Sequence, residues 1–168
     1  KGIEHGIPAI HINGQSRSAT TYLQYTLCHG LDIPGCYICA GSHTSRCTMM
    51  PTAAKLFALG GTLFVGHWIP TPQILADLMK YKMNKVVVNI RDPRDCMFSE
   101  ISLYDRLLGE SNWLSELQVV SGRLSSAADE GFLRERMKSI MRFHNQVCDG
   151  WLRAAQEQQD VRILINRF

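Results

Sequence analysis

INGQSRSATTYL, residues 12–23, joins an apolar, strand-like run to a helix-like run through small and hydroxyl-rich residues. At such a junction the first N–H groups of the helix have no partner within the helix, and the helix dipole favours an anion there. Ser18, Thr20 and Thr21 add hydroxyl donors, and Arg17 adds a planar, permanent positive charge. The stretch therefore predicts a loop that binds phosphate or sulfate, with an unliganded polar turn as the alternative interpretation.

A second segment of the same kind occupies residues 86–99. VVVNI at 86–90 is typical of a strand buried on both faces, and it leads directly into RDPRDCMFS at 91–99. Asp92 and Pro93 are suited to cap and open the next helix, which places Arg91 at the end of the strand and Ser99 about two turns into the helix. Both side chains are then expected to reach one anion, although a salt-bridged helix start is the plainer alternative.

Together the two segments resemble the nucleotide-binding motifs of sulfotransferases that use 3′-phosphoadenosine 5′-phosphosulfate (PAPS). In that family a Lys or Arg precedes Ser-Gly-Thr-Thr and an aromatic residue often follows, while an arginine and a serine eight residues later hold the 3′-phosphate. This chain departs from the pattern at Ser16, where proline is common, and at Ala19, where glycine is common. The resemblance implies the following nucleotide-binding residues: Arg17, Ser18, Ala19, Thr20, Thr21, Tyr22, Arg91 and Ser99.

The alternation of apolar runs predicts an α/β fold. Strands are expected at 7–12, 62–65, 86–90 and 161–165, and helices at 19–30, 52–59, 72–81, 93–108 and 131–158. Residues 31–52 are expected to form an irregular connection, and 109–129 a mobile insertion with one short helix. This order favours a three-layer parallel sheet flanked by helices, with both anion sites at the carboxyl ends of strands. The resemblance implies a P-loop NTPase-like fold and a single sulfotransferase-like domain over 1–168 that lacks its C-terminal part.

Composition narrows the classes of function. With 168 residues and 45% hydrophobic content, the chain can bury a full core without disulfides or a metal. A net charge of +3 suits a small anionic ligand and falls short of the basic surface of a nucleic-acid binder, so no nucleic acid is expected as a partner. No membrane segment is visible as a run of about eighteen apolar residues. The cellular location stays open, with the cytoplasm as the favoured expectation.

Cysteines and histidines offer one alternative site. The six cysteines are sparse for a disulfide scaffold of this length, so mostly free thiols are expected, with Cys96 and Cys148 inside helices. Cys36, Cys39, His43 and Cys47 are spaced so that zinc is a second interpretation of a loop with ordinary cysteines. His11 and His144 are expected in the core.

The resemblance also implies the chemistry. A sulfuryl group would pass from PAPS to a hydroxyl or amine of a small-molecule or glycan acceptor, leaving PAP, with Arg17 stabilising the leaving group and no metal required. His67 is the candidate base, because GHWIP at 66–70 follows a strand and resembles the Thr-His-Leu-Pro segment of cytosolic sulfotransferases; a structural histidine is the alternative. Trp68, Tyr22 and Phe98 are candidates for stacking on adenine or lining the acceptor pocket, although packing in the core is the commoner fate of such side chains.

Three other functions stay open at this stage. A P-loop kinase or nucleotide hydrolase would require magnesium and ATP, and the loop lacks the Walker A lysine. A non-catalytic nucleotide-binding module and a zinc-stabilised interaction module are the others. The sequence predicts neither the acceptor nor the oligomeric state.

Overall fold

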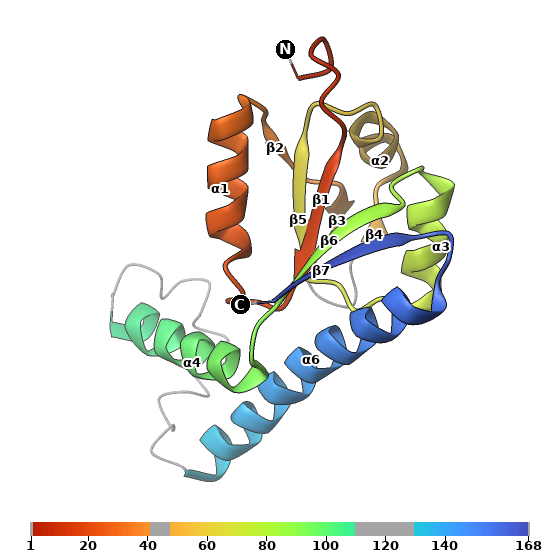
Figure 1. Ribbon diagram of the computed structural model, residues 1–168. Helices are drawn as coiled ribbons and strands as arrows, with labels where there is room; N and C mark the ends of the chain where they lie inside the picture. The colour runs from red at the N-terminus through yellow and green to blue at the C-terminus, as the bar shows by residue number, and fades with distance from the viewer. Residues whose placement is uncertain (1, 41–47, 110–129, 168) are drawn as a thin grey trace.

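β1 (Ile10–Gly14) lies at the centre of a five-stranded parallel sheet whose order is β2-β5-β1-β6-β7 (Figure 1). The computed structural model describes residues 2–40, 48–109 and 130–167. The other strands of the sheet are β2 (Gly35–Cys36), β5 (Leu63–Gly66), β6 (Lys85–Ile90) and β7 (Arg162–Arg167), and β3 (Cys39–Ala40) pairs with β4 (Thr48–Met49) in a separate antiparallel ribbon. The helices are α1 (Thr20–Leu31), α2 (Pro51–Phe57), α3 (Pro72–Lys80), α4 (Pro93–Gly109) and α6 (Glu130–Glu157).

The central strands are apolar on both faces because both faces are covered. In the parallel register, Ile12 lies between Val65 of β5 and Val87 of β6. These residues belong to a small core between the sheet and α1, whereas a larger core lies between the opposite face and helices α2, α3 and α6 (Figure 1). Burial of both cores supplies the main driving force for folding.

Two histidines lie in the interior, as predicted. His11 is 2% exposed, and its ring packs 5.2 Å from that of Trp68 between ring centroids. Burial lowers the pKa of His11 to about 3, so this imidazole is neutral at physiological pH. His144 on α6 is fully buried, and its Nε2 lies 3.1 Å from Glu100 Oε2 on α4. That contact joins α6 to the helix that carries Ser99.

The predicted α/β class, parallel sheet and flanking helices are confirmed. The expected strand at 7–12 is displaced, since β1 runs from Ile10 to Gly14. The irregular connection predicted for 31–52 is wrong in part, because β2 adds an edge strand to the sheet through its pairing with β5. The expected insertion at 109–129 lies almost entirely outside the described residues. Among those described, no helix combines the length and the hydropathy needed to cross a membrane.

Candidate functional site

The loop after β1 turns into α1 through two residues in the left-handed conformation. Arg17 has φ 66°, and Ala19 has φ 58° and ψ 18°. Among the described residues no side chain caps α1, and its first turn holds no acidic residue. The first N–H groups of this helix are therefore left for water or a ligand, the arrangement by which helix N-termini bind anions.

Gly14 allows β1 and β6 to approach closely where this loop begins. A Cβ at position 14 would lie 2.5 Å from the backbone O of Asn89 and 2.9 Å from Ser18 Oγ. Any larger residue would have to displace β6 or the loop. Gly14 thus sets the spacing between the two segments that the sequence marks as anion-binding.

Gln15 connects those two segments directly. Its side chain is fully buried, and its Oε1 accepts a hydrogen bond from the backbone N–H of Arg91 at 2.8 Å. Its backbone carbonyl accepts from Ser18 Oγ at 2.7 Å. The Ser18 hydroxyl proton is therefore used inside the loop, where the sequence predicted a donor to the ligand. Sequence reasoning missed Gln15, although a buried amide directly after a buried strand is a usable signal.

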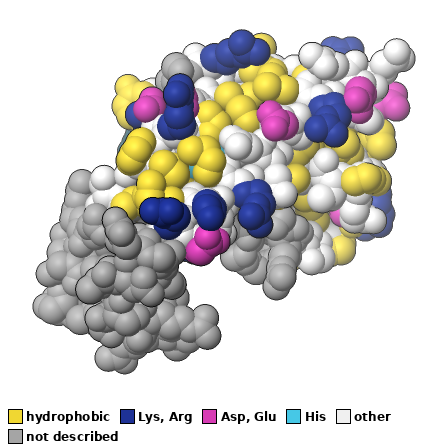
Figure 2. Space-filling model, turned by 90° about the horizontal axis from the view of Figure 1, so that it is seen from below, with side chains coloured by type: hydrophobic (Ala, Val, Ile, Leu, Met, Phe, Trp, Pro, Cys, Tyr) yellow, Lys and Arg dark blue, Asp and Glu magenta, His cyan; other side chains and the backbone are white. Residues whose placement is uncertain are grey.

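Arg17, Arg91 and Ser99 come together at the carboxyl edge of the sheet. Arg17 Nε donates to Ser99 Oγ at 3.1 Å, and Arg91 Nη1 donates to the backbone O of Arg17 at 3.3 Å. Arg91 is half-buried and Arg17 is exposed. Figure 2 looks onto the molecule from this side and shows a row of basic side chains with a hydrophobic patch beside it. The predicted convergence of the two segments is thus present in the fold.

The start of α4 follows the prediction for a capped helix. Asp92 Oδ1 accepts from the backbone N–H of Arg94 at 2.9 Å, and Pro93 is the first helical residue. The Arg94 side chain also binds this carboxylate, and together these hydrogen bonds lower the pKa of Asp92 to about 2. Arg91 Nε lies 3.7 Å from Asp95 Oδ2 one turn later. The carboxylates thus orient this turn, while Arg91 keeps its contact with the loop.

His67 stands beside the same loop. Its Nδ1 lies 2.9 Å from the backbone O of Gly14. Because a carbonyl oxygen only accepts, Nδ1 carries the proton, and in the neutral ring Nε2 is then the basic nitrogen. The half-buried imidazole is therefore held at the end of β1 in the tautomer that a general base requires.

Asn13 and Trp151 fix the segment that carries His67. Asn13 Nδ2 donates to the backbone O of Trp68, and Asn13 Oδ1 accepts from the Trp68 N–H, both at 2.9 Å. Trp151 Nε1 donates to the same carbonyl at 2.7 Å. Sequence reasoning missed Asn13, whose partner lies 55 residues away.

The three aromatic candidates, Trp68, Tyr22 and Phe98, differ in how much of each side chain is exposed. Trp68 is 1% exposed and packs against His11 and Phe64, so for this residue the structure shows the core packing that the sequence offered as the alternative to contact with a ligand. Tyr22 on α1 and Phe98 on α4 are 69% and 58% exposed. Both remain available for contact with a ligand at this edge.

The zinc interpretation has half of its residues outside the described part of the chain, namely His43 and Cys47. Cys36 lies in β2 and Cys39 in β3, and burial raises the pKa of Cys36. Among the described residues, no group of three or more His, Cys, Asp or Glu side chains is placed to hold a metal ion.

Comparisons with protein-family models, curated proteins and solved structures give no match to this chain. The contacts at the carboxyl edge of the sheet therefore carry the functional proposal. Two guanidinium groups, a hydroxyl and an uncapped helix terminus lie together there with an imidazole beside them, a set of groups suited to an anion and called here the candidate anion-binding edge.

Replacing Ala19 by glycine should raise the free energy of unfolding by ~1 kcal/mol, because a Cβ is disfavoured at φ 58°. Urea unfolding measures the change. Ala76→Gly, at an exposed position inside α3, is the matched control and should lower stability by ~1 kcal/mol. Equal losses in both variants would show that the left-handed conformation at 19 stores no strain.

Proposed function

We propose that this chain is a PAPS-dependent sulfotransferase of the P-loop-like class. The observation that carries the proposal is the contact between Arg17 and Ser99, which joins two motifs 82 residues apart in sequence. The 3′-phosphate and the 5′-phosphosulfate of PAPS are attached to the same ribose, so the residues that bind them have to lie close together. Arg17 and residues 19–22 would hold the 5′-phosphosulfate, and Arg91 and Ser99 the 3′-phosphate.

The topology supports this location. The chain passes from β5 on one side of β1 to β6 on the other, and the loop after β1 lies where this reversal occurs. Ligands of open α/β sheets bind at such a position, outside the carboxyl ends of the strands. The position of the loop, between the central strand β1 and helix α1, supports the P-loop-like class, whereas the missing Walker A lysine weighs against a kinase or ATP hydrolase.

The chain's own residues would divide the chemistry between them. PAPS, when bound, supplies the sulfuryl group and leaves as PAP. His67 would take the proton from the acceptor hydroxyl or amine as its oxygen or nitrogen bonds to sulfur. Arg17 would stabilise the negative charge that grows on the phosphate oxygen as its bond to sulfur breaks. Most of the rate enhancement then comes from positioning and electrostatics, as in phosphoryl transfer.

Arg91→Ala and Ser99→Ala should each weaken PAP binding by about tenfold to a hundredfold, since each removes a hydrogen bond to a charged phosphate. Calorimetry measures the affinity. Arg94→Ala is the matched control: Arg94 is exposed and paired with Asp92, so its loss should leave the affinity nearly unchanged. Unchanged affinity in all three variants would overturn the assignment of the 3′-phosphate site.

A thermal-shift comparison separates the competing functions. A ligand that binds the folded state raises the melting temperature. PAP should therefore raise it more than either ATP with magnesium or zinc alone. Greater stabilisation by ATP with magnesium would favour a P-loop kinase or hydrolase. Binding of PAP without any transfer from PAPS would favour a non-catalytic nucleotide-binding module.

A further inference from the structure

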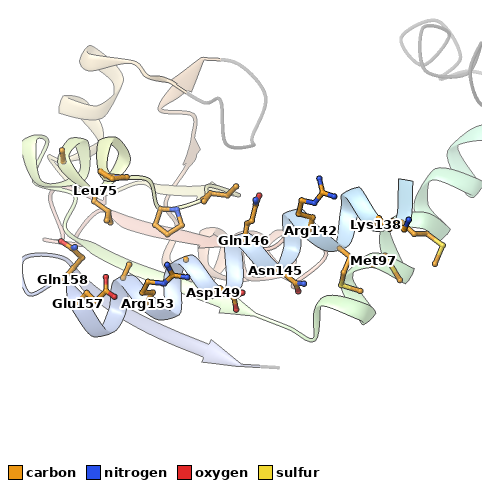
Figure 3. A pocket seen from close by; sticks show the side chains of 18 of the residues that line it. Leu75, Met97, Lys138, Arg142, Asn145, Gln146, Asp149, Arg153, Glu157 and Gln158 are labelled. Carbon is orange, nitrogen blue, oxygen red and sulfur yellow. The ribbon is translucent and has the colours of Figure 1, made fainter. Parts of the chain in front are cut away.

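A groove of about 1140 Å³ runs along α6, outside the candidate anion-binding edge (Figure 3). One wall is the side of α6 that carries Lys138, Arg142, Gln146 and Arg153. Ile69, Pro70 and α3 contribute to the other wall. Its volume lies slightly above the usual range for small-molecule sites, which is about 300–1,000 Å³. None of the residues assigned to nucleotide binding lines it, so the proposed nucleotide leaves it free for another ligand.

The lining of this groove, called here the α6 groove, is largely apolar. Four methionines contribute to it from three helices: Met79, Met97, Met137 and Met141. Ile69 and Leu75 extend the apolar surface toward α3. Methionine adapts its shape to an apolar ligand, whereas sugar hydroxyls placed against such a surface would lose hydrogen bonds to water without replacement. The lining therefore favours an acceptor with a hydrocarbon body over a glycan.

The charges at the groove are unbalanced. Its basic residues are Arg134, Lys138, Arg142 and Arg153, and its acidic residues are Asp149 and Glu157. Lys138 is paired with Glu135 at 2.7 Å, but within the described part of the chain Arg142 and Arg153 form no ion pair. Guanidinium groups beside an apolar surface are suited to a carboxylate, sulfate or phosphate. The ligand is thus expected to carry an acidic group.

One end of the groove lies near the proposed base. Ile69, which lines the groove, follows His67 by two residues, so their Cα atoms lie within about 8 Å. Gly150 lets α6 approach this point, since a Cβ there would lie 2.8 Å from Pro70 Cδ. From Gly150 to Arg142 the helix extends about 12 Å. An elongated molecule can therefore place its hydroxyl near His67 and its acidic end at Arg142.

We infer that the acceptor is an anionic amphiphile with an elongated hydrocarbon body, held in the α6 groove with its acidic group at Arg142. The inference rests on the proposed function, because the groove is read as the acceptor site of the same reaction. It assigns Arg142 to recognition of the acid and Met141 to contact with the hydrocarbon.

The test uses ω-hydroxydodecanoate as the anionic probe and dodecanol as its neutral counterpart, with binding measured by calorimetry in the presence of PAP. Arg142→Glu should weaken binding of ω-hydroxydodecanoate by at least about tenfold and leave dodecanol unaffected. Met141→Asn should weaken both probes. Lys55→Glu, the same change of charge at an exposed position of α2, should alter neither.

The inference is overturned if the unmodified protein does not bind ω-hydroxydodecanoate, or if Arg142→Glu behaves as Lys55→Glu does. Thermal shifts with PAP on the same samples keep the two proposals apart. Stabilisation by PAP without binding of the amphiphile overturns the acceptor inference alone. Absence of stabilisation by PAP overturns the proposed function, whatever the probes do.

Discussion

His67→Ala should lower kcat for sulfuryl transfer from PAPS by about 10²–10⁴-fold, the range by which a positioned general base accelerates a reaction. Nδ1 of the imidazole donates to the backbone O of Gly14, so Nε2 is the nitrogen that would accept the proton. Affinity for PAP should be unchanged, because the contacts assigned to the nucleotide come from other residues. Release of PAP from PAPS, followed over a panel of hydroxyl- and amine-bearing acceptors, measures kcat.

His29→Ala is the matched control, since His29 is an exposed histidine in the last turn of α1, away from the loop at its N-terminus. Its kcat should equal that of the unmodified protein. A His67→Ala variant that folds, binds PAP and keeps its full kcat would show that His67 is only a structural residue at the end of β5.

Regular elements were predictable where local chemistry alone specifies them. α3 begins where Thr71 Oγ1 accepts from the N–H of Ile74 at 3.2 Å and where Pro72 supplies a preset φ. β6 follows from the three consecutive valines at 86–88 and from Ile90. β2 was missed because its two residues form a strand only through pairing with β5, and no pattern in the neighbouring sequence predicts this pairing.

The residues of the candidate site also fall into a group that the sequence predicts and a group that it does not. The side chains that would touch the nucleotide were predictable, because hydroxyls and arginines between a strand and a helix have a known chemical use. The residues that hold them in place were not. Gln15 acts through the N–H of Arg91, and Asn13 through the backbone of Trp68, so each depends on a contact across more than fifty residues. For the same reason the sequence left Trp68 open between contact with a ligand and packing in the core: the contacts with Asn13 and the core that decide its position come from distant parts of the chain.

Arg17→Asn should lower kcat by about 10²–10³-fold, the cost of removing one preorganised charge from a developing anion. Asparagine is among the residues that tolerate a positive φ, so the backbone of the loop at φ 66° should be preserved. The decrease in kcat would then result from the missing guanidinium group and not from a change in the loop backbone. Urea unfolding of the variant checks that its stability is retained.

Arg17→Lys should recover only part of the rate, because a lysine ammonium is a point charge and lacks the planar fork that also reaches Ser99 Oγ. PAP affinity should fall less than kcat in both variants, since the charge that Arg17 stabilises is greatest in the transition state. Calorimetry and turnover measured on the same preparations give the two quantities. Equal losses of affinity and kcat would instead assign Arg17 to uniform binding of the 5′-phosphate, with no particular role in the departure of the leaving group.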